Sequence, residues 1–143
     1  NPSHILKKKP HQFGGDFLYL PKKWLEISQL VGMIINMGLI ILGSSLIPIP
    51  EGSDPMNAIN WELTNFIFPF LAHVLGTLVG AFLAAKIANS YQLPLAMSIG
   101  VFFLIGGVIM VYILPAPAWF ICTDLIVAYI PMGYLGWIIA KKV

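Results

Sequence analysis

Four long apolar runs constrain the fold of this sequence more than any other feature. They comprise residues 24–47, 62–88, 92–114 and 118–140. Crossing about 30 Å of hydrocarbon takes roughly 20 helical residues at about 1.5 Å each. Only 10% of the 143 residues are charged, whereas roughly a quarter are charged in soluble domains. The sequence therefore predicts an all-α, polytopic membrane protein with one four-helix domain over residues 24–143.

Short polar or proline-rich segments separate the four runs. Residues 48–55 contain three prolines and a glycine, which cannot continue a helix. The segments 89–91 and 115–117 are so short that consecutive helices must be antiparallel neighbours. We therefore expect an up-down-up-down bundle. The first run is too long for a cleaved signal peptide and lacks a small-residue cleavage site, so we expect it to span the membrane.

All eight basic residues are lysines, and they fall on one side of the predicted bundle. Five precede the first span, Lys86 closes the second, and two follow the fourth, Lys141 and Lys142. Both loops on the other side lack Lys and Arg. The positive-inside rule then predicts that both termini are cytoplasmic. Because the lysines report topology, we expect no nucleic-acid partner.

The first 23 residues form a basic segment that has no core of its own. This segment combines a short apolar patch with five lysines, and the residues expected to dock are Lys7, Lys8, Lys9, Lys22, Lys23, Phe17 and Tyr19. We predict a cytoplasmic arm held by another membrane subunit or by the lipid surface. The alternative is an arm folded back on its own bundle.

Small residues recur at helical spacing in the second and third spans. In the second span they step by four residues, and the set predicted to pack helices is Ala72, Gly76, Gly80, Ala84, Gly100 and Gly107. Such a face lets another helix approach until the backbones touch. The pattern indicates helix packing and says nothing about activity.

His73 is the only histidine within the apolar runs, and Asp124 is the only acid placed well inside one. Counting about 1.5 Å per residue puts His73 about 16 Å and Asp124 about 9 Å from the outer ends of their helices. The resulting gap of about 7 Å could be bridged by the side chains and one water. A buried polar pair is therefore possible, and intramembrane carboxylates often mark ion or proton routes.

Two plainer roles compete with a proton route. His73 could simply donate one hydrogen bond across the bundle, and Asp124 could accept from Thr123, Asn65 or Tyr129 and fix helix register. Ligation of haem by two histidines needs a second histidine at similar depth, but His4 and His11 both lie in the arm. We therefore expect neither a metal nor a cofactor within this chain.

Reactive residues are otherwise scarce. Cys122 is the only cysteine, and we interpret it as a small hydrophobic residue. We expect the Asn36 amide to form a hydrogen bond between helices. Pro131 predicts a bend in the fourth helix, because it leaves the carbonyl of Val127 without its usual donor. No nucleophile lies near a histidine and an acid in the sequence. We expect no catalytic residues and no enzyme activity.

Three stretches together resemble a family of small bacterial four-helix membrane proteins with no settled activity. They are the loop Pro48 to Pro55, the run from His73 to Gly80, and the segment from Pro117 to Asp124 that continues through Tyr129 to Met132. The resemblance covers about Gly32 to Ala140. It implies a bacterial cytoplasmic membrane, and the basic arm departs from the family pattern.

Two functions fit the sequence. The leading hypothesis is a non-catalytic accessory subunit of a larger membrane complex, for example a respiratory or photosynthetic electron-transfer assembly, with other membrane subunits and lipid as partners. The alternative is a small proton-coupled transporter that uses Asp124 and His73.

Overall fold

The computed structural model describes residues 22–143, and the regular structure in this part of the chain is entirely helical. It contains five α-helices, α2 (Lys22–Leu46), α3 (Ile67–Ile87), α4 (Gln92–Ile113), α5 (Ala118–Val127) and α6 (Ile130–Lys142), and two 3-10 helices, η1 (Ala58–Asn60) and η2 (Leu63–Phe66). The predicted arm residues Lys7, Lys8, Lys9, Phe17 and Tyr19 lie outside the described residues. Lys22 and Lys23 begin α2 and are exposed.

Four helical stretches in residues 22–143 are long and apolar enough to cross a membrane. They are Lys22–Leu46, Leu63–Ile87, Gln92–Ile113 and Ala118–Lys142. Each holds at least 22 residues, which exceeds the roughly 20 needed to span the hydrocarbon. These helices define a multi-pass α-helical membrane protein, as the hydropathy of the sequence predicts.

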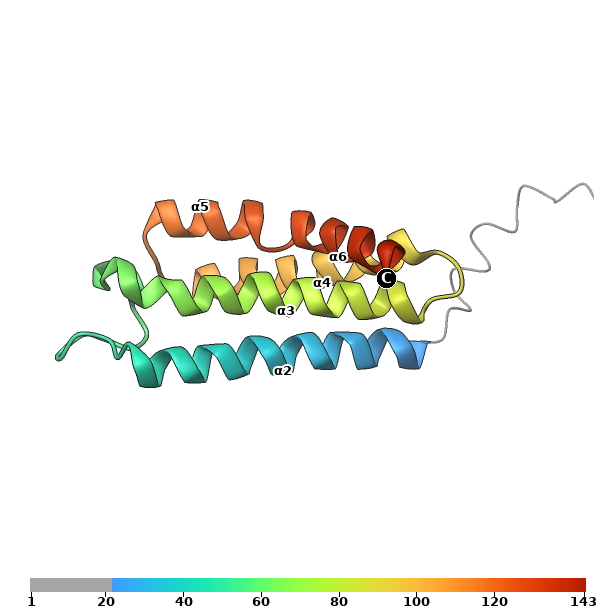
Figure 1. Ribbon diagram of the computed structural model, residues 1–143. Coiled ribbons are helices and arrows are strands. Elements are labelled where there is room, and N and C mark those ends of the chain that lie inside the picture. The colour runs from blue at the N-terminus through green and yellow to red at the C-terminus, as the bar shows by residue number, and fades with distance from the viewer. Residues whose placement is uncertain (1–21) are drawn as a thin grey trace, which may run out of the picture.

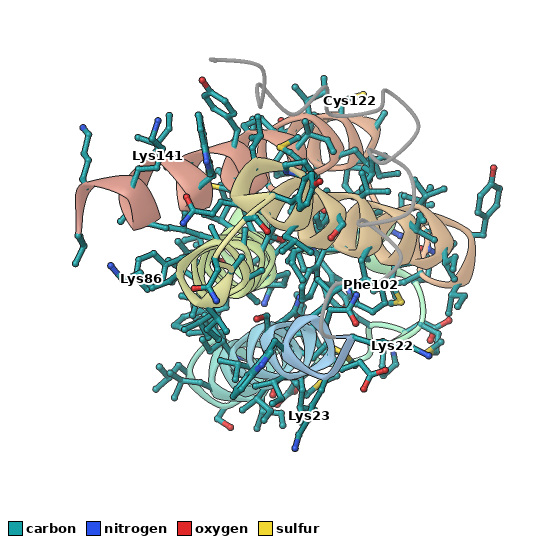
Figure 2. All side chains as sticks on the ribbon, turned by 90° about the vertical axis from the view of Figure 1, so that its right-hand side faces the viewer. Lys22, Lys23, Lys86, Phe102, Cys122 and Lys141 are labelled. Atoms are coloured by element: carbon teal, nitrogen blue, oxygen red, sulfur yellow. The ribbon has the colours of Figure 1, made fainter. Side chains whose placement is uncertain are left out.

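The four stretches lie side by side in one bundle (Figure 1). The loops 47–57 and 114–117 lie at one end of the bundle, and the loop 88–91 lies at the other (Figure 1). Lys22, Lys23, Lys86 and Lys141 surround that second end, which faces the viewer in Figure 2. The lysines of the described chain therefore gather at one end of the molecule.

Helix α3 occupies the centre of the bundle and packs against α2, α4 and α6. Its small residues allow this, because Ala72, Gly76, Ala81 and Ala85 are buried without projecting bulk into a neighbour. Helix α2 packs mainly on α3 and buries only Ser28, Gly32 and Gly43 among its residues. The remaining surface of α2 is mostly apolar and suits contact with lipid.

The contact between α2 and α3 is made backbone against backbone. A Cβ atom built on Gly32 would lie 2.6 Å from the carbonyl oxygen of Gly76. A Cβ atom on Gly80 would lie 3.1 Å from the carbonyl oxygen of Ser28. Ser28 and Gly32 in α2 thus face Gly76 and Gly80 in α3, two small-residue pairs with the same four-residue step. This close approach replaces the hydrophobic driving force that helices lack inside lipid.

Helix α6 makes equally close contacts with α3 and α4. A Cβ atom on Gly136 would lie 2.8 Å from the backbone nitrogen of Phe82 in α3. A Cβ atom on Gly100 of α4 would lie 3.0 Å from the carbonyl oxygen of Tyr129, just before α6. Gly106 has open space around it, although Gly107 beside it faces Tyr129. Of these two adjacent glycines, only Gly107 lies in a close contact.

The fourth span is two helices, α5 and α6, where the sequence predicts one bent helix over 118–140. The break falls at Ala128 and Tyr129, with Tyr129 at φ −116° and ψ −74°. Pro131 cannot donate to the carbonyl of Val127, so the helical hydrogen-bond pattern stops there. The predicted bend is therefore a break. It places Tyr129 at the junction, where the side chain is almost completely buried.

Asn65, at the start of the second span, binds the backbone where the loop after α2 begins. Its amide nitrogen donates to the carbonyls of Ile47 and Pro48 at 3.3 and 3.1 Å. Its amide oxygen accepts from the backbone N–H of Glu62 at 3.1 Å. The backbone N–H of Ala58 also donates to the carbonyl of Pro115 at 2.8 Å. This last bond joins the two loops at one end of the bundle.

Candidate functional site

A histidine and an aspartate from different helices meet inside the bundle. Nδ1 of His73 in α3 lies 2.8 Å from Oδ1 and 3.0 Å from Oδ2 of Asp124 in α5. By residue count His73 is about 15 Å from Leu63, and so lies near the middle of the 25-residue span Leu63–Ile87. The contact is direct and needs no bridging water. Asp124 is 5% exposed, so the carboxyl group depends on protein partners for its hydrogen bonds.

Tyr129, at the break between α5 and α6, completes the cluster. Its hydroxyl donates to Oδ2 of Asp124 at 2.8 Å and lies 3.1 Å from Nδ1 of His73. Tyr129 is 1% exposed, and its ring packs beside the His73 ring with centroids 5.8 Å apart. Gly107 of α4 makes room for it, since a Cβ there would lie 2.5 Å from the hydroxyl oxygen. Three helical stretches and the break thus assemble one site.

The contacts of Asp124 favour one tautomer of a neutral His73 ring, with an ionised Asp124 beside it. Both carboxyl oxygens face Nδ1, and Oδ2 also receives the Tyr129 hydroxyl. A carboxylate offers lone pairs to both donors, so Asp124 accepts from Nδ1–H and from O–H. The neutral imidazole then carries its lone pair on Nε2. Asp124 therefore orients the His73 ring and makes Nε2 an acceptor.

Nε2 of His73 has no hydrogen-bond partner in residues 22–143 and is not fully buried. The His73 hydrogen bonds all involve Nδ1. In residues 22–143 the fully buried side-chain polar atoms without a partner are Trp61 Nε1 and Thr77 Oγ1. The His73 side chain keeps 18% of its surface exposed. The space that this ring lines is a cavity of about 200 Å³.

The cavity runs from the joined loops to the polar cluster. Its walls come from the start of the second span, the end of α4 and the start of α5, and it is lined by Ile40, Ala58, Trp61, Phe66, Pro69, His73, Gly107, Met110, Val111, Leu114, Ala116, Phe120, Ile121, Asp124 and Leu125. Apart from His73 and Asp124, these side chains are uncharged and almost all apolar. An apolar cavity with a few converging polar groups is the usual form of a small-molecule site.

The other polar residues singled out from the sequence have separate roles. Thr123 donates to the carbonyl of Trp119 in its own helix at 2.8 Å, and Asn65 binds the loop ends, so neither contacts Asp124. Asn36 makes no hydrogen bond with any residue of the 22–143 part, which leaves the predicted interhelical bond unformed there. Cys122 is exposed on α5. Within the described chain no three His, Cys, Asp or Glu side chains converge as metal ligands.

Sequence reasoning missed part of the site. Tyr129 appeared only as one of three alternative donors to Asp124, and the cavity was not predicted at all. The available signal was the five-residue step from Asp124 to Tyr129 followed by Pro131, because a helix that breaks there turns both side chains inward. Gly107 was assigned to helix packing, and the structure places it against the Tyr129 hydroxyl.

The fold and the site together define a polytopic α-helical membrane protein with a buried His–Asp–Tyr cluster beside an apolar cavity. Comparison with family models, curated proteins and solved structures finds no match to this chain.

Proposed function

We propose that this protein is a small proton-coupled membrane transporter whose proton-exchange site is the cluster of His73, Asp124 and Tyr129. The single observation that carries the proposal is the direct 2.8 Å contact of His73 with Asp124 on a ring that lines a cavity. A titratable pair at membrane depth is costly to maintain and typically serves ion or proton movement. Nε2, which has no hydrogen-bond partner in residues 22–143, gives a proton a place to arrive on a ring that lines the cavity.

The break in the fourth span supports the same function. Discontinuous helices commonly form the substrate and ion sites of transporters, because non-helical backbone at membrane depth is tolerated where protein or a cavity satisfies it. Tyr129 lies at the break and Asp124 lies one turn before it. A change of angle between α5 and α6 would therefore move the carboxyl group relative to His73 in α3.

We also propose an orientation for the transporter. Its helices cross a bacterial cytoplasmic membrane in up-down-up-down order, with both termini and the lysine end in the cytoplasm. Lys141 lies 4.6 Å from the Trp137 ring centroid, a pairing suited to a membrane interface. The cavity then opens toward the non-cytoplasmic end. In a Cys122→Ser background, an impermeant maleimide should label Glu51→Cys and not Ser90→Cys in intact cells, and the reverse pattern would refute this orientation.

Proton flux measured in proteoliposomes tests the transport function. Interior pyranine reports proton uptake under an imposed pH gradient while small organic solutes are added outside one at a time. The parent protein should show uptake with at least one solute above the rate in protein-free liposomes. Asp124→Asn should abolish that uptake, because the amide replaces the proton-accepting carboxyl group.

Thr123→Val is the matched control for Asp124→Asn. Thr123 is the preceding residue, is exposed, and bonds only within its own helix, so the substitution should leave proton uptake unchanged. Equal uptake by parent and Asp124→Asn, or no uptake by the parent with any solute, would reject the transporter.

A second candidate is the accessory subunit, and Asn36 favours it. Asn36 lies within the α2 span, is half-buried, and has no hydrogen-bond partner in residues 22–143. An unsatisfied amide in hydrocarbon costs free energy, and amides of this kind often bond to a neighbouring helix. Mild-detergent purification with crosslinking through α2 should then recover a stable hetero-complex that Asn36→Leu weakens. A lone monomer or homodimer would exclude this role.

A further inference from the structure

His73, which lines the cavity, has one ring nitrogen without a hydrogen-bond partner in residues 22–143, its Nε2 atom. In the neutral tautomer whose Nδ1–H points to Asp124, Nε2 carries a free lone pair on a ring that lines the cavity. Asp124 itself is occupied by His73 and Tyr129 and has little capacity left for a ligand. A molecule bound here therefore gains most by donating a hydrogen bond to Nε2.

The size and walls of the cavity favour a flat apolar ring. An apolar cavity of about 150 Å³ stays dry and binds benzene, and the volume here is about 200 Å³. Three aromatic side chains line it, and they form a continuous group. Phe66 lies 4.6 Å from Phe120 and 6.1 Å from Trp61 between ring centroids. Aromatic walls pack well against a ring through offset or edge contacts.

We infer that the cavity binds a lipophilic ring compound carrying a hydroxyl group, of the phenol class, whose O–H donates to Nε2 of His73. The inference rests on the proposed function, since it names the substrate class of the same site. A charged solute would lose its hydration against walls that are apolar except at His73 and Asp124, and an unsubstituted hydrocarbon ring would leave Nε2 unpaired. The hydroxyl-bearing ring satisfies both the walls and the acceptor.

Two fluorinated probes that differ by one hydroxyl test the inference. Binding of 4-fluorophenol and of fluorobenzene to the protein in lipid nanodiscs is followed by ¹⁹F NMR, with protein-free nanodiscs as the measure of partition into lipid. The protein should prefer 4-fluorophenol by about tenfold, the value of one hydrogen bond. Ala116→Phe, which fills the cavity away from the cluster, should abolish binding of both probes.

Asp124→Asn tests the role of the lone pair in this preference. An asparagine amide can donate to Nδ1, which moves the ring proton to Nε2 and turns that atom from an acceptor into a donor. The preference for the phenol should then fall from about tenfold to about twofold or less, with the folded protein checked by size exclusion. Thr123→Val should keep the full preference.

The possible outcomes separate the ligand class from the transport function. Equal binding of the two probes, no binding, or binding that survives Ala116→Phe would overturn the phenol inference. If Asp124→Asn still abolishes proton uptake with other solutes, the transporter stands and only the ligand class fails. If the phenol is preferred as expected but drives no proton uptake, the ligand class stands and the transport function fails.

Discussion

Replacing Gly32 by alanine should separate α2 from α3. The added Cβ atom would lie 2.6 Å from the carbonyl oxygen of Gly76 and 2.9 Å from the Phe103 ring. The carbonyl oxygen belongs to a rigid helix backbone, so the helices must move apart by roughly half an ångström or more to reach ordinary contact distance, and much of the dispersion energy along the interface is then lost. Overpacking of this kind costs about 1–3 kcal/mol.

Gly38→Ala in the same helix is the matched control. A Cβ atom on Gly38 meets nothing within 4 Å, so this substitution should be neutral or should stabilise α2 by up to about 1 kcal/mol through the higher helix propensity of alanine. The two variants should therefore differ by about 1–4 kcal/mol in the free energy of unfolding.

Reversible unfolding in mixed micelles, titrated with sodium dodecyl sulfate and followed by circular dichroism, measures that difference. Gly32→Ala should shift the midpoint to lower denaturant and Gly38→Ala should not. If the two variants unfold at the same midpoint, close packing at Gly32 does not hold α2 in place and the reasoning is wrong.

Three further variants test the interior in the same unfolding assay. Thr77→Val should be neutral or stabilise the protein by about 1 kcal/mol, because the Thr77 hydroxyl is buried without a partner and its removal relieves a desolvation cost; clear destabilisation would show that the hydroxyl does find a partner. Tyr129→Phe should cost about 1–2 kcal/mol through loss of the 2.8 Å bond to Asp124, and an unchanged midpoint would mean that the bond contributes nothing. Gly107→Ala should displace the Tyr129 hydroxyl, which would lie 2.5 Å from the new Cβ, and should lower stability by about 1–3 kcal/mol; Gly106→Ala, with open space around it, should not.

The spans were predictable from the sequence because hydropathy and length act locally. The predicted range 92–114 differs by one residue from Gln92–Ile113, and 24–47 differs by two residues at its start from Lys22–Leu46. The shape of the fourth span was harder to predict, since Pro131 indicates that the helix is distorted but not by how much. Whether a proline bends or breaks a helix depends on the surrounding helices that satisfy the freed backbone.

The partners of the small residues were not predictable, because they depend on tertiary packing. Gly76 and Gly80 were assigned to packing, but nothing in the sequence said that Ser28 and Gly32 would face them, although both pairs share a four-residue step. The pairing of His73 with Asp124 was open to prediction from helix depth alone. The cavity was not, since it depends on how fifteen residues from several elements meet.

The distance in sequence between His73 and Asp124 has a consequence for biosynthesis. The two residues are 51 positions apart, and a ribosome adding about 5–20 residues per second takes roughly 3–10 s to cover that interval. During this time α3 has already emerged with an imidazole whose carboxyl partner has not yet been made. An imidazole without a partner is costly at membrane depth, so we expect a chain stopped after α4 to be a preferred target of membrane proteases.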